Sequence, residues 1–474
     1  MLFRSSGALL STSNGFIETS GEYLTTTGIQ IKAKDWLLDP NNIEINATSA
    51  ANTAGNSVVL ASDIVNALSG GANVVISTGT AGSTNASATS TGSAVGITGT
   101  GTQGSGTIAV NTAIAGASNA VIAGSANSSL TLSAASNITV GAEINTAGDV
   151  FLQSSGGMIR NTSAISGRNI SIDNTGGAIN TATGGITAGT SASGASVNGV
   201  ELKAAITASK NLNVYGASSG ANGILSQANL AAAYINATGK STTGSVAFAW
   251  NGGTISTTGT GGTSTASTVT GISNASTSAS VGWAAFSMYS NSSATAANGT
   301  TLSLIGNAPT VAAGALVNQR GWRINSGVTL NTTGDISIIG SSSSSDGLLI
   351  GGTINNQASP SSKLTLQGTT SASSSAGLSG INISGGAING GSSTGAIKLI
   401  GTANNTSTTT PDYAISFVSG ASMTGGSASS VTLQSTIGTI NLNTTSAISA
   451  ASGNLIIQSS GNNISQAAGS LSAK

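Results

Sequence analysis

The stretch "SSLTLSAASNITVGAEINTAGDVFLQSSGGMIRNTSAISGRNISID", residues 128–173, repeats one short pattern three times. Each copy begins with a turn residue or a small polar residue and continues as apolar, any residue, apolar. The copies are "SSLTL", "GDVFL" and "RNISI", and their first apolar residues, Leu130, Val150 and Ile170, are spaced by 20 positions. Because alternate side chains of a strand share one face, each copy predicts a short strand with an apolar face.

The same pattern recurs along most of the chain. It returns in "GTIAV" from Gly106, "KNLNV" from Lys210, "TTLSL" from Thr300, "GDISI" from Gly334, "SKLTL" from Ser362, "GAIKL" from Gly395, "SSVTL" from Ser429, "GTINL" from Gly438 and "GNLII" from Gly453. One such unit buries too little apolar surface to be stable alone, whereas stacked units bury a continuous column. The sequence therefore predicts an all-β protein, a right-handed parallel β-helix (β-solenoid) with about 20 residues per coil.

Composition excludes several classes of function. The 474 residues include 13 basic and 13 acidic ones, 5% charged in all, with no His and no Cys. Without His or Cys, neither a Ser/His/Asp triad nor a Cys-based metal site can form, and we predict no cofactor. Balanced charge without a basic cluster argues against nucleic acid as a partner. No apolar run reaches the length of a transmembrane helix.

The chain is interpreted as one rod with a distinct first segment. Residues 1–63 would start the rod and residues 64–474 would form its repetitive part. Residues 64–142 and 241–319 contain no charge and keep no regular spacing. We therefore expect loop-rich stretches at 64–105 and 241–300.

Carboxylates are the remaining candidates for catalysis, because β-helices can carry paired acids that cleave polysaccharides. A coil of about 20 residues would place Asp149 near Asp173, with Glu201 further along. The sequence also offers a structural interpretation, in which Asp149 occupies the turn before "VFLQ" and Asp173 ends a strand. We favour the structural interpretation and predict no catalytic residue.

The first 46 residues differ from the repetitive part. Eight of the 26 charged residues of the chain lie in its first 44 positions, around "GFIETSG" (15–21) and "KDWLLDPNNIEIN" (34–46). Trp36, Leu37 and Leu38 offer a bulkier core contact than the ordinary repeats. Asp39 and Pro40 then end the strand with a turn.

These two elements, in this order and spacing, resemble a segment of filamentous-haemagglutinin-like two-partner-secretion exoproteins, in the high-molecular-weight adhesin branch. The resemblance rests on Phe16, Glu18, Thr19, Ser20, Gly21, Trp36, Leu37, Leu38, Asp39 and Pro40. It implies a right-handed β-helix that a Gram-negative bacterium exports through a dedicated outer-membrane pore. Such a virulence protein is secreted or stays at the cell surface, where it attaches to host cells, to surfaces or to neighbouring bacteria by binding a host receptor or glycan. The family's amino-terminal secretion domain normally precedes this segment, so we expect an internal fragment of a larger exoprotein.

Members of that branch can carry glycans on the Asn of Asn-x-Ser/Thr. The resemblance therefore offers as glycosylation sites Asn46, Asn137, Asn169, Asn331, Asn382 and Asn463, although such triplets are no more frequent than a Ser- and Thr-rich chain produces by chance. The predicted function is a non-enzymatic adhesin. A carbohydrate-active β-helix enzyme and a structural component of a surface layer or biofilm matrix are the alternatives.

Overall fold

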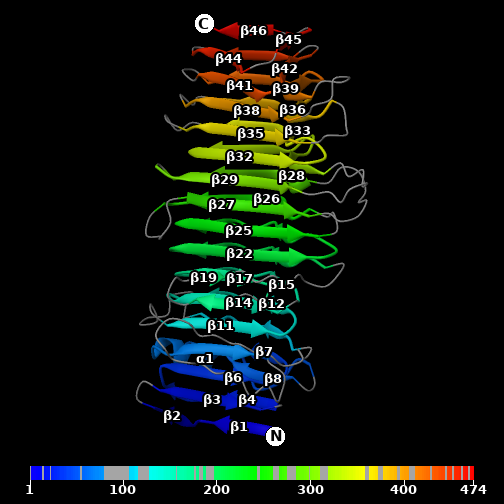
Figure 1. Cartoon of the computed structure of the whole chain (residues 1–474). Coiled ribbons are helices and arrows are strands. Elements are labelled where there is room, and N and C mark those ends of the chain that lie inside the picture. The colour runs from blue at the N-terminus through cyan, green and yellow to red at the C-terminus, as the bar shows by residue number, and fades with distance from the viewer. Residues whose placement is uncertain are drawn as a thin grey trace. The chain divides into compact units, whose positions relative to one another are not determined.

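A computed structural model of the chain shows a nearly all-β protein (Figure 1). The residues that it describes are 2–12, 15–21, 23–53, 56–78, 106–115, 128–155, 157–175, 178–180, 185–187, 197–242, 246–259, 266–274, 284–297, 299–309, 319–357, 362–371, 377–391, 395–404, 412–426, 430–443, 446–450, 453–460, 463–467 and 470–473. The chain divides into two units, one of residues 1–217 and one that comprises nearly all of 218–474.

Unit 1 contains short strands and one helix. Its elements are β1 (Leu2–Ser6), β2 (Leu9–Ser11), β3 (Phe16–Ser20), β4 (Tyr23–Thr27), β5 (Gln30–Lys32), β6 (Asp35–Asp39), β7 (Ile43–Asn46), β8 (Ser57–Leu60), α1 (Ala61–Ser69), β9 (Asn73–Ser77), β10 (Ile108–Val110), β11 (Ser129–Ala134), β12 (Ile138–Val140), β13 (Ile144–Asn145), β14 (Asp149–Ser154), β15 (Ile159–Asn161), β16 (Ile165–Gly167), β17 (Ile170–Asp173), β18 (Ala178–Asn180), β19 (Gly185–Thr187), β20 (Val200–Leu202), β21 (Ile206–Ala208) and β22 (Asn211–Ser218).

Unit 2 contains longer strands, and the division between the units passes through β24. Its elements are β23 (Ile224–Ser226), β24 (Leu230–Ala232), β25 (Tyr234–Ser241), β26 (Phe248–Thr257), β27 (Ala266–Ser273), β28 (Ala284–Thr295), β29 (Thr301–Ala308), β30 (Arg320–Ile324), β31 (Thr329–Thr333), β32 (Asp335–Ser342), β33 (Leu348–Ile350), β34 (Thr353–Asn356), β35 (Leu364–Thr370), β36 (Ser379–Ser384), β37 (Ala387–Asn389), β38 (Ile397–Ala403), β39 (Tyr413–Val418), β40 (Ser422–Gly425), β41 (Val431–Ile437), β42 (Thr439–Leu442), β43 (Ala447–Ala450), β44 (Leu455–Ser459), β45 (Ile464–Gln466) and β46 (Ser470–Ala473).

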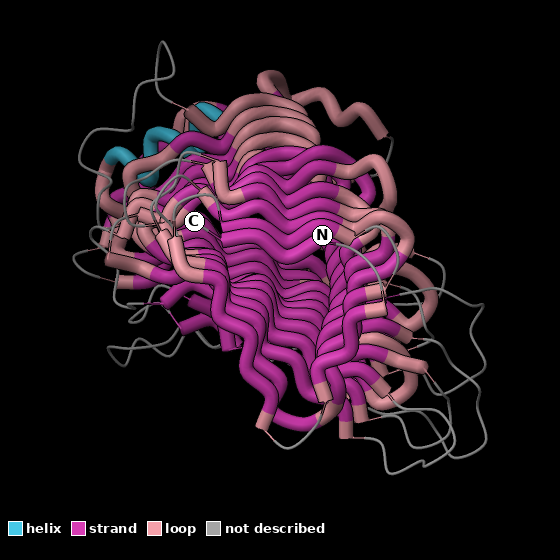
Figure 2. Tube along the Cα trace, turned by 90° about the horizontal axis from the view of Figure 1, so that it is seen from above, coloured by secondary structure: helices cyan, strands magenta, loops and turns pink. Residues whose placement is uncertain are grey.

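The strands form long parallel sheets stacked in register, which confirms the predicted parallel β-helix. In unit 1, β11, β12 and β13 make one coil, and β14, β15 and β16 lie over them as the next. The register places Leu130 beside Val150 and Val150 beside Ile170, and all three side chains are fully buried. In the view from above, the strands of neighbouring coils within a unit lie over one another (Figure 2). The 20-residue spacing is therefore the length of these coils.

The coils of unit 2 are longer than predicted. Ser341 on β32 donates a hydrogen bond to Asn307, which lies 34 residues earlier on β29, and Lys363 bonds to Asp335, 28 residues earlier. The reason is strand length, since β29 and β32 have eight residues each whereas β14 has six. The pattern in the sequence also marked strands of different faces, because Ile108 of "GTIAV" pairs with Ile138 and not with Leu130.

An inward-facing column of glycines runs through unit 2. Gly306, Gly340, Gly368 and Gly401 are register partners on β29, β32, β35 and β38, each four residues after the first inward Ile or Leu of its strand. A Cβ atom on Gly340 would lie 2.1 Å from the carbonyl oxygen of Gly347, and the other three meet equally close backbone atoms. Only a residue without a side chain fits there, so these glycines allow two sheets to approach closely.

Aromatic side chains form a stack inside unit 2. The ring of Phe286 lies 4.8 Å from the ring of Phe248 and 5.5 Å from that of Trp322, and all three side chains are fully buried. They are register partners on β26, β28 and β30. Stacked aromatic pairs add to the free energy that burial itself supplies.

The described parts of the stretches expected to be loop-rich are regular elements. Residues 64–78 contain most of α1 and all of β9, and residues 241–300 contain β26, β27 and β28. Small polar residues concealed these strands because their outward positions are Ser, Thr and Gly. Residues 79–105, 260–265 and 275–283 lie outside the described residues. The helix α1 was not predicted, although Ala61, Ile64, Ala67 and Leu68 bury one face at helical spacing.

Candidate functional site

The two halves of the family-like segment lie on adjacent coils. The segment "FIETS" is β3 and "DWLLD" is β6, and the strands pair in parallel with Ile17 beside Trp36 and Thr19 beside Leu38. The two elements that the sequence separates by about 20 positions are thus in direct contact. This juxtaposition gives their order and spacing a structural reason.

Trp36 is the centre of this contact. Its side chain is fully buried, and its Nε1 donates a hydrogen bond of 2.9 Å to the Thr19 hydroxyl. Thr19 in turn donates to the Leu37 carbonyl at 3.4 Å. Leu37 and Leu38 are buried, and β6 ends immediately before the buried Pro40. These residues therefore form core structure.

The other residues of the segment face outward. Glu18 and Ser20 are exposed and bonded to each other at 2.7 Å, and Phe16 is 39% exposed. Gly21 and Asp39 are half-buried. None of these side chains converges on a pocket with the others, so the segment offers no catalytic or cofactor-binding arrangement.

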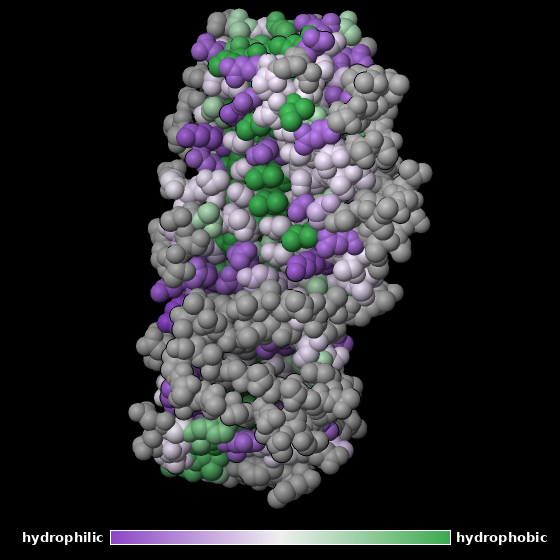
Figure 3. Space-filling view, viewed as in Figure 1, coloured by the Kyte–Doolittle hydropathy of each residue, from purple (hydrophilic) through white to green (hydrophobic). Residues whose placement is uncertain are grey.

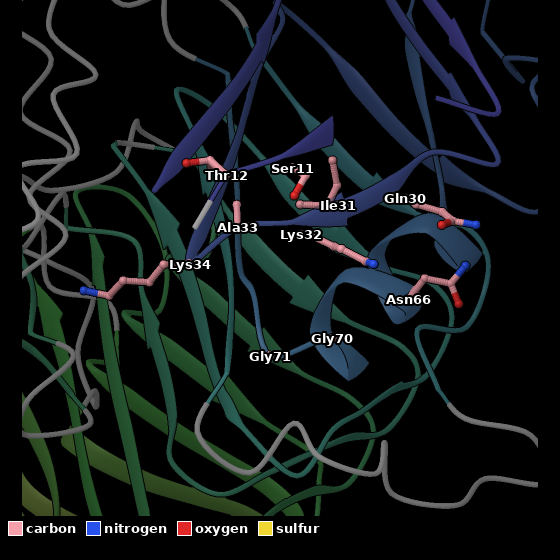
Figure 4. Close-up of a pocket in the computed structure, with 10 residues that line it drawn as sticks. All are labelled: Ser11, Thr12, Gln30, Ile31, Lys32, Ala33, Lys34, Asn66, Gly70 and Gly71. Carbon is pink, nitrogen blue, oxygen red and sulfur yellow. The ribbon is translucent and has the colours of Figure 1, made fainter. Parts of the chain in front are cut away.

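A surface pocket of about 810 Å³ lies between the end of β2, the strand β5 and the C-terminal end of α1. Figure 4 shows the side chain of Lys32 directed toward α1 and that of Lys34 directed away from it. A cation near a helix C-terminus is stabilised by the helix dipole, which gives Lys32 a structural role. The pocket has no acidic or nucleophile–base pair among its lining residues, which are Ser11, Thr12, Gln30, Ile31, Lys32, Ala33, Lys34, Asn66, Gly70 and Gly71.

The acidic residues considered for catalysis do not converge. Asp149 begins β14, whereas Asp173 ends β17 and lies beside Gln153 at the far end of β14. Four residues of strand separate the two positions by about 13 Å. Asp149 also accepts two hydrogen bonds of 2.7 Å from Arg168, and this interaction raises the pKa of the Arg168 guanidinium.

Glu201 lies on a different sheet from Asp149 and Asp173. It occupies β20, where its carboxylate pairs with Arg160 of β15 at 2.6 Å and with Lys203 at 3.4 Å. Burial raises the pKa of Glu201, but the hydrogen bonds from Arg160 and Asn198 outweigh burial and leave that pKa lowered. Each of the three acids is therefore bonded by its own neighbours, as the structural interpretation expected. Among the described residues, no group of three or more acids could hold a metal ion.

The sequon asparagines have different environments. Asn137 and Asn463 are exposed, and Asn331 and Asn382 are half-buried. Asn46 and Asn169 are buried, and both side-chain amides donate hydrogen bonds to carboxylates, to Glu44 at 3.1 Å and to Asp149 at 2.9 Å. A glycan on Asn46 or Asn169 would break these buried bonds, so in the folded chain only the other four could carry one.

Two buried carboxylates escaped the sequence interpretation. Glu44 on β7 accepts hydrogen bonds from the backbone of Thr53 at 2.8 Å and from the Asn56 side chain at 2.9 Å. Asp346, which precedes β33, accepts one of 2.9 Å from the backbone of Ser379. The alternating "IEIN" around Glu44 indicated a strand but gave no sign that its outward residue would be covered.

The most regular surface of the chain is the outward face of β27, β29, β32, β35, β38 and β41, which we call the outer ladder. Its residues stand in columns, because each strand is in register with the next. Figure 3 shows hydrophobic residues along the middle of this face of unit 2, between polar neighbours. Sequence reasoning missed it because the spacing between successive strands varies.

Comparison with protein-family models and with characterised proteins gives no match to this chain. Within the part of the chain that the structure describes, no helix has the length and apolar character needed to cross a membrane.

Proposed function

We propose that the chain is a non-enzymatic, surface-exposed adhesin scaffold, or an internal fragment of a large secreted exoprotein, that mediates attachment to host cells, surfaces or neighbouring bacteria. The observation that carries this proposal is the outer ladder. Its strands present chemically similar side chains at a constant spacing of about 4.8 Å. Many weak and equivalent contacts along such a face combine into strong attachment, because each bound contact raises the effective concentration of the next.

The distribution of carboxylates supports binding over hydrolysis. A glycosidase needs two carboxyl groups within about 5–10 Å of each other. Asp149 and Asp173 lie at opposite ends of neighbouring strands, and Glu201 is on another sheet. The geometry of these three residues thus gives no support to the carbohydrate-active enzyme that the sequence left open.

The place of action rests on the resemblance of the β3 and β6 segment. We propose secretion to the surface of a Gram-negative bacterium through an outer-membrane pore of the two-partner type. The contact between Trp36 and Thr19 supports this proposal only in part, since it shows that the two motif elements act as one structural unit. The chain's partners outside the cell would be a host receptor or glycan.

Attachment is tested with beads that carry the purified chain. We expect these beads to adhere to cultured epithelial cells or to bacterial cells several-fold more than beads coated with serum albumin. A variant with Thr365→Glu and Gln434→Glu, which places charges on the outer ladder, should lose this adhesion while keeping its circular dichroism spectrum. Equal adhesion of the variant, or release of sugars from a polysaccharide by the chain, would contradict the proposal.

A further inference from the structure

Two columns of the outer ladder carry polar groups without a partner. The first contains the hydroxyls of Ser303, Ser337 and Thr365, which are register partners on β29, β32 and β35. The second contains the amides of Gln367 and Gln434. Within the described part of the chain, none of these five side chains hydrogen-bonds to another protein group, and all are half-buried or exposed. Their hydrogen-bonding capacity is available to a ligand.

The neighbouring third column is different, which marks the first two as distinctive. There the Ser341 hydroxyl donates to the Asn307 amide oxygen at 2.8 Å, and the Thr402 and Thr436 hydroxyls lie 2.6 Å apart. These polar groups satisfy one another from one coil to the next. The unpartnered groups are therefore concentrated on one side of the face.

Apolar side chains alternate with the free amides in the second column. Ile305 and Ile339 are adjacent, Gln367 follows, then Ile400, then Gln434, and the three isoleucines are half-buried. In Figure 3 the hydrophobic line on this face of unit 2 is accordingly interrupted by polar residues. A ligand on this column would meet aliphatic surface and amides in turn.

The two columns carry little charge. Lys398 is the one ionisable side chain among the described residues of these columns from β29 to β41. A charged polymer would find almost no counter-charge here, and burying its charges would cost free energy. The chemistry of the face is thus complementary to an uncharged partner that has both hydroxyl groups and C–H surface.

We propose that the outer ladder binds an extended neutral polysaccharide, with the sugar chain lying across successive coils. The hydroxyls of Ser337 and Thr365 and the amide of Gln367 would hydrogen-bond to sugar hydroxyls, while Ile305 and Ile339 contact the C–H faces of the rings. A pyranose unit is about as long as the spacing of about 4.8 Å between neighbouring strands. Successive sugars can therefore meet successive coils. This inference rests on the proposed adhesive function and names the class of ligand.

Affinity electrophoresis of the whole chain tests the inference. The gels contain a soluble neutral α-glucan, β-glucan or mannan, or the charged polysaccharides alginate or heparin. We expect at least one neutral polysaccharide to retard the chain, equally at low and high salt. The double variant Ser337→Ala with Thr365→Ala should bind that polysaccharide about tenfold more weakly, because it loses two hydrogen bonds.

A matched control comes from another face of the same coils. Thr329 on β31 and Thr353 on β34 are also register partners with half-buried outward side chains. The double variant Thr329→Ala with Thr353→Ala should bind like the original chain. Equal weakening by both variants, retardation by charged polysaccharides alone, or no retardation would overturn the inference. If the chain adheres to cells through the outer ladder but neutral polysaccharides do not compete, the inference fails while the proposed function stands.

Discussion

The two units build the same fold with different coils. In unit 1, β11, β14 and β17 are spaced by 20 residues and have no inward glycine at their register-paired positions. In unit 2, the coils are up to 34 residues long at β29 and β32, and an inward glycine lies in every strand from β29 to β38. The comparison shows that alternation of apolar residues specifies the sheets, whereas the length of the strands and the inward glycines set the shape of each coil.

The largest effect is expected at the specialised contact of unit 1. Trp36→Ala removes a fully buried side chain and its hydrogen bond to Thr19, and it should destabilise unit 1 by about 3–5 kcal/mol. The measurement is the midpoint of urea denaturation followed by circular dichroism. A midpoint equal to that of the original chain would show that the β3 and β6 contact contributes nothing to stability.

The glycine column of unit 2 gives the next effect. Gly340→Ala places a Cβ atom 2.1 Å from the Gly347 carbonyl oxygen, and the forced movement of backbone should destabilise unit 2 by about 3 kcal/mol. Gly327→Ala is the control, because its positive φ costs about 1 kcal/mol although nothing lies within 4 Å. The denaturation midpoint should fall more for Gly340→Ala. The opposite order would refute the role of the column.

Buried carboxylates make the units respond differently to acid. Burial raises the pKa of Glu44, but hydrogen bonds from Asn52, Asn46, Asn56 and Thr53 outweigh burial and leave that pKa lowered. The stability that Glu44 contributes is therefore present above its unfolded pKa of about 4.3 and is lost as the pH falls through its folded value. Glu44→Gln should lower the denaturation midpoint at pH 7 and have little effect near pH 3.

Asp346 in unit 2 has the opposite sign. Burial raises its pKa despite the hydrogen bond from Ser379 and the nearby Arg320. Its contribution is complete below an unfolded pKa of about 3.9 and is lost as the pH rises through its folded value. The difference in midpoint between the original chain and Asp346→Asn should therefore change in favour of the variant as the pH rises from 3 to 7. A change in the other direction would contradict the burial of this carboxylate.

The smallest effect on stability is expected on the outer ladder. Ser337→Ala with Thr365→Ala removes two outward hydroxyls that have no described protein partner, so the free energy of unfolding should change by less than about 0.5 kcal/mol per substitution. The denaturation midpoint measures this. A large loss would mean that the hydroxyls serve the fold and are not free for a ligand.

The fold could be predicted from the sequence because each strand needs only two or three alternating apolar residues, as in "LTL" at Leu364 and "IKL" at Ile397. The shape of the coils could not. Gly340 and its partners follow those residues at a fixed position, but glycine supplies 67 positions in the chain, which hides a meaningful one among many. The helix α1 is only nine residues long and was concealed by neighbouring strands.

The candidate site was harder to predict than the fold. The sequence showed that Trp36 was unusual, but the contact with Thr19 depends on the coil length, which only the register supplies. The separation of Asp149 from Asp173 has the same origin, because a 24-residue interval does not place two residues side by side in coils of 20. The columns of the outer ladder arise from strands that are 28 to 34 residues apart, and no fixed period in the sequence reveals them.

The most direct test of the adhesive role uses the absence of cysteine from the chain. A single cysteine is introduced at Thr365 on the outer ladder or at Thr353 on another face of the same coils, and each is coupled to a bulky maleimide polymer. Beads carrying the two labelled chains are then compared for adhesion to cells. The account predicts that the label at position 365 abolishes adhesion while the label at position 353 leaves it intact. Equal adhesion of the two would contradict it.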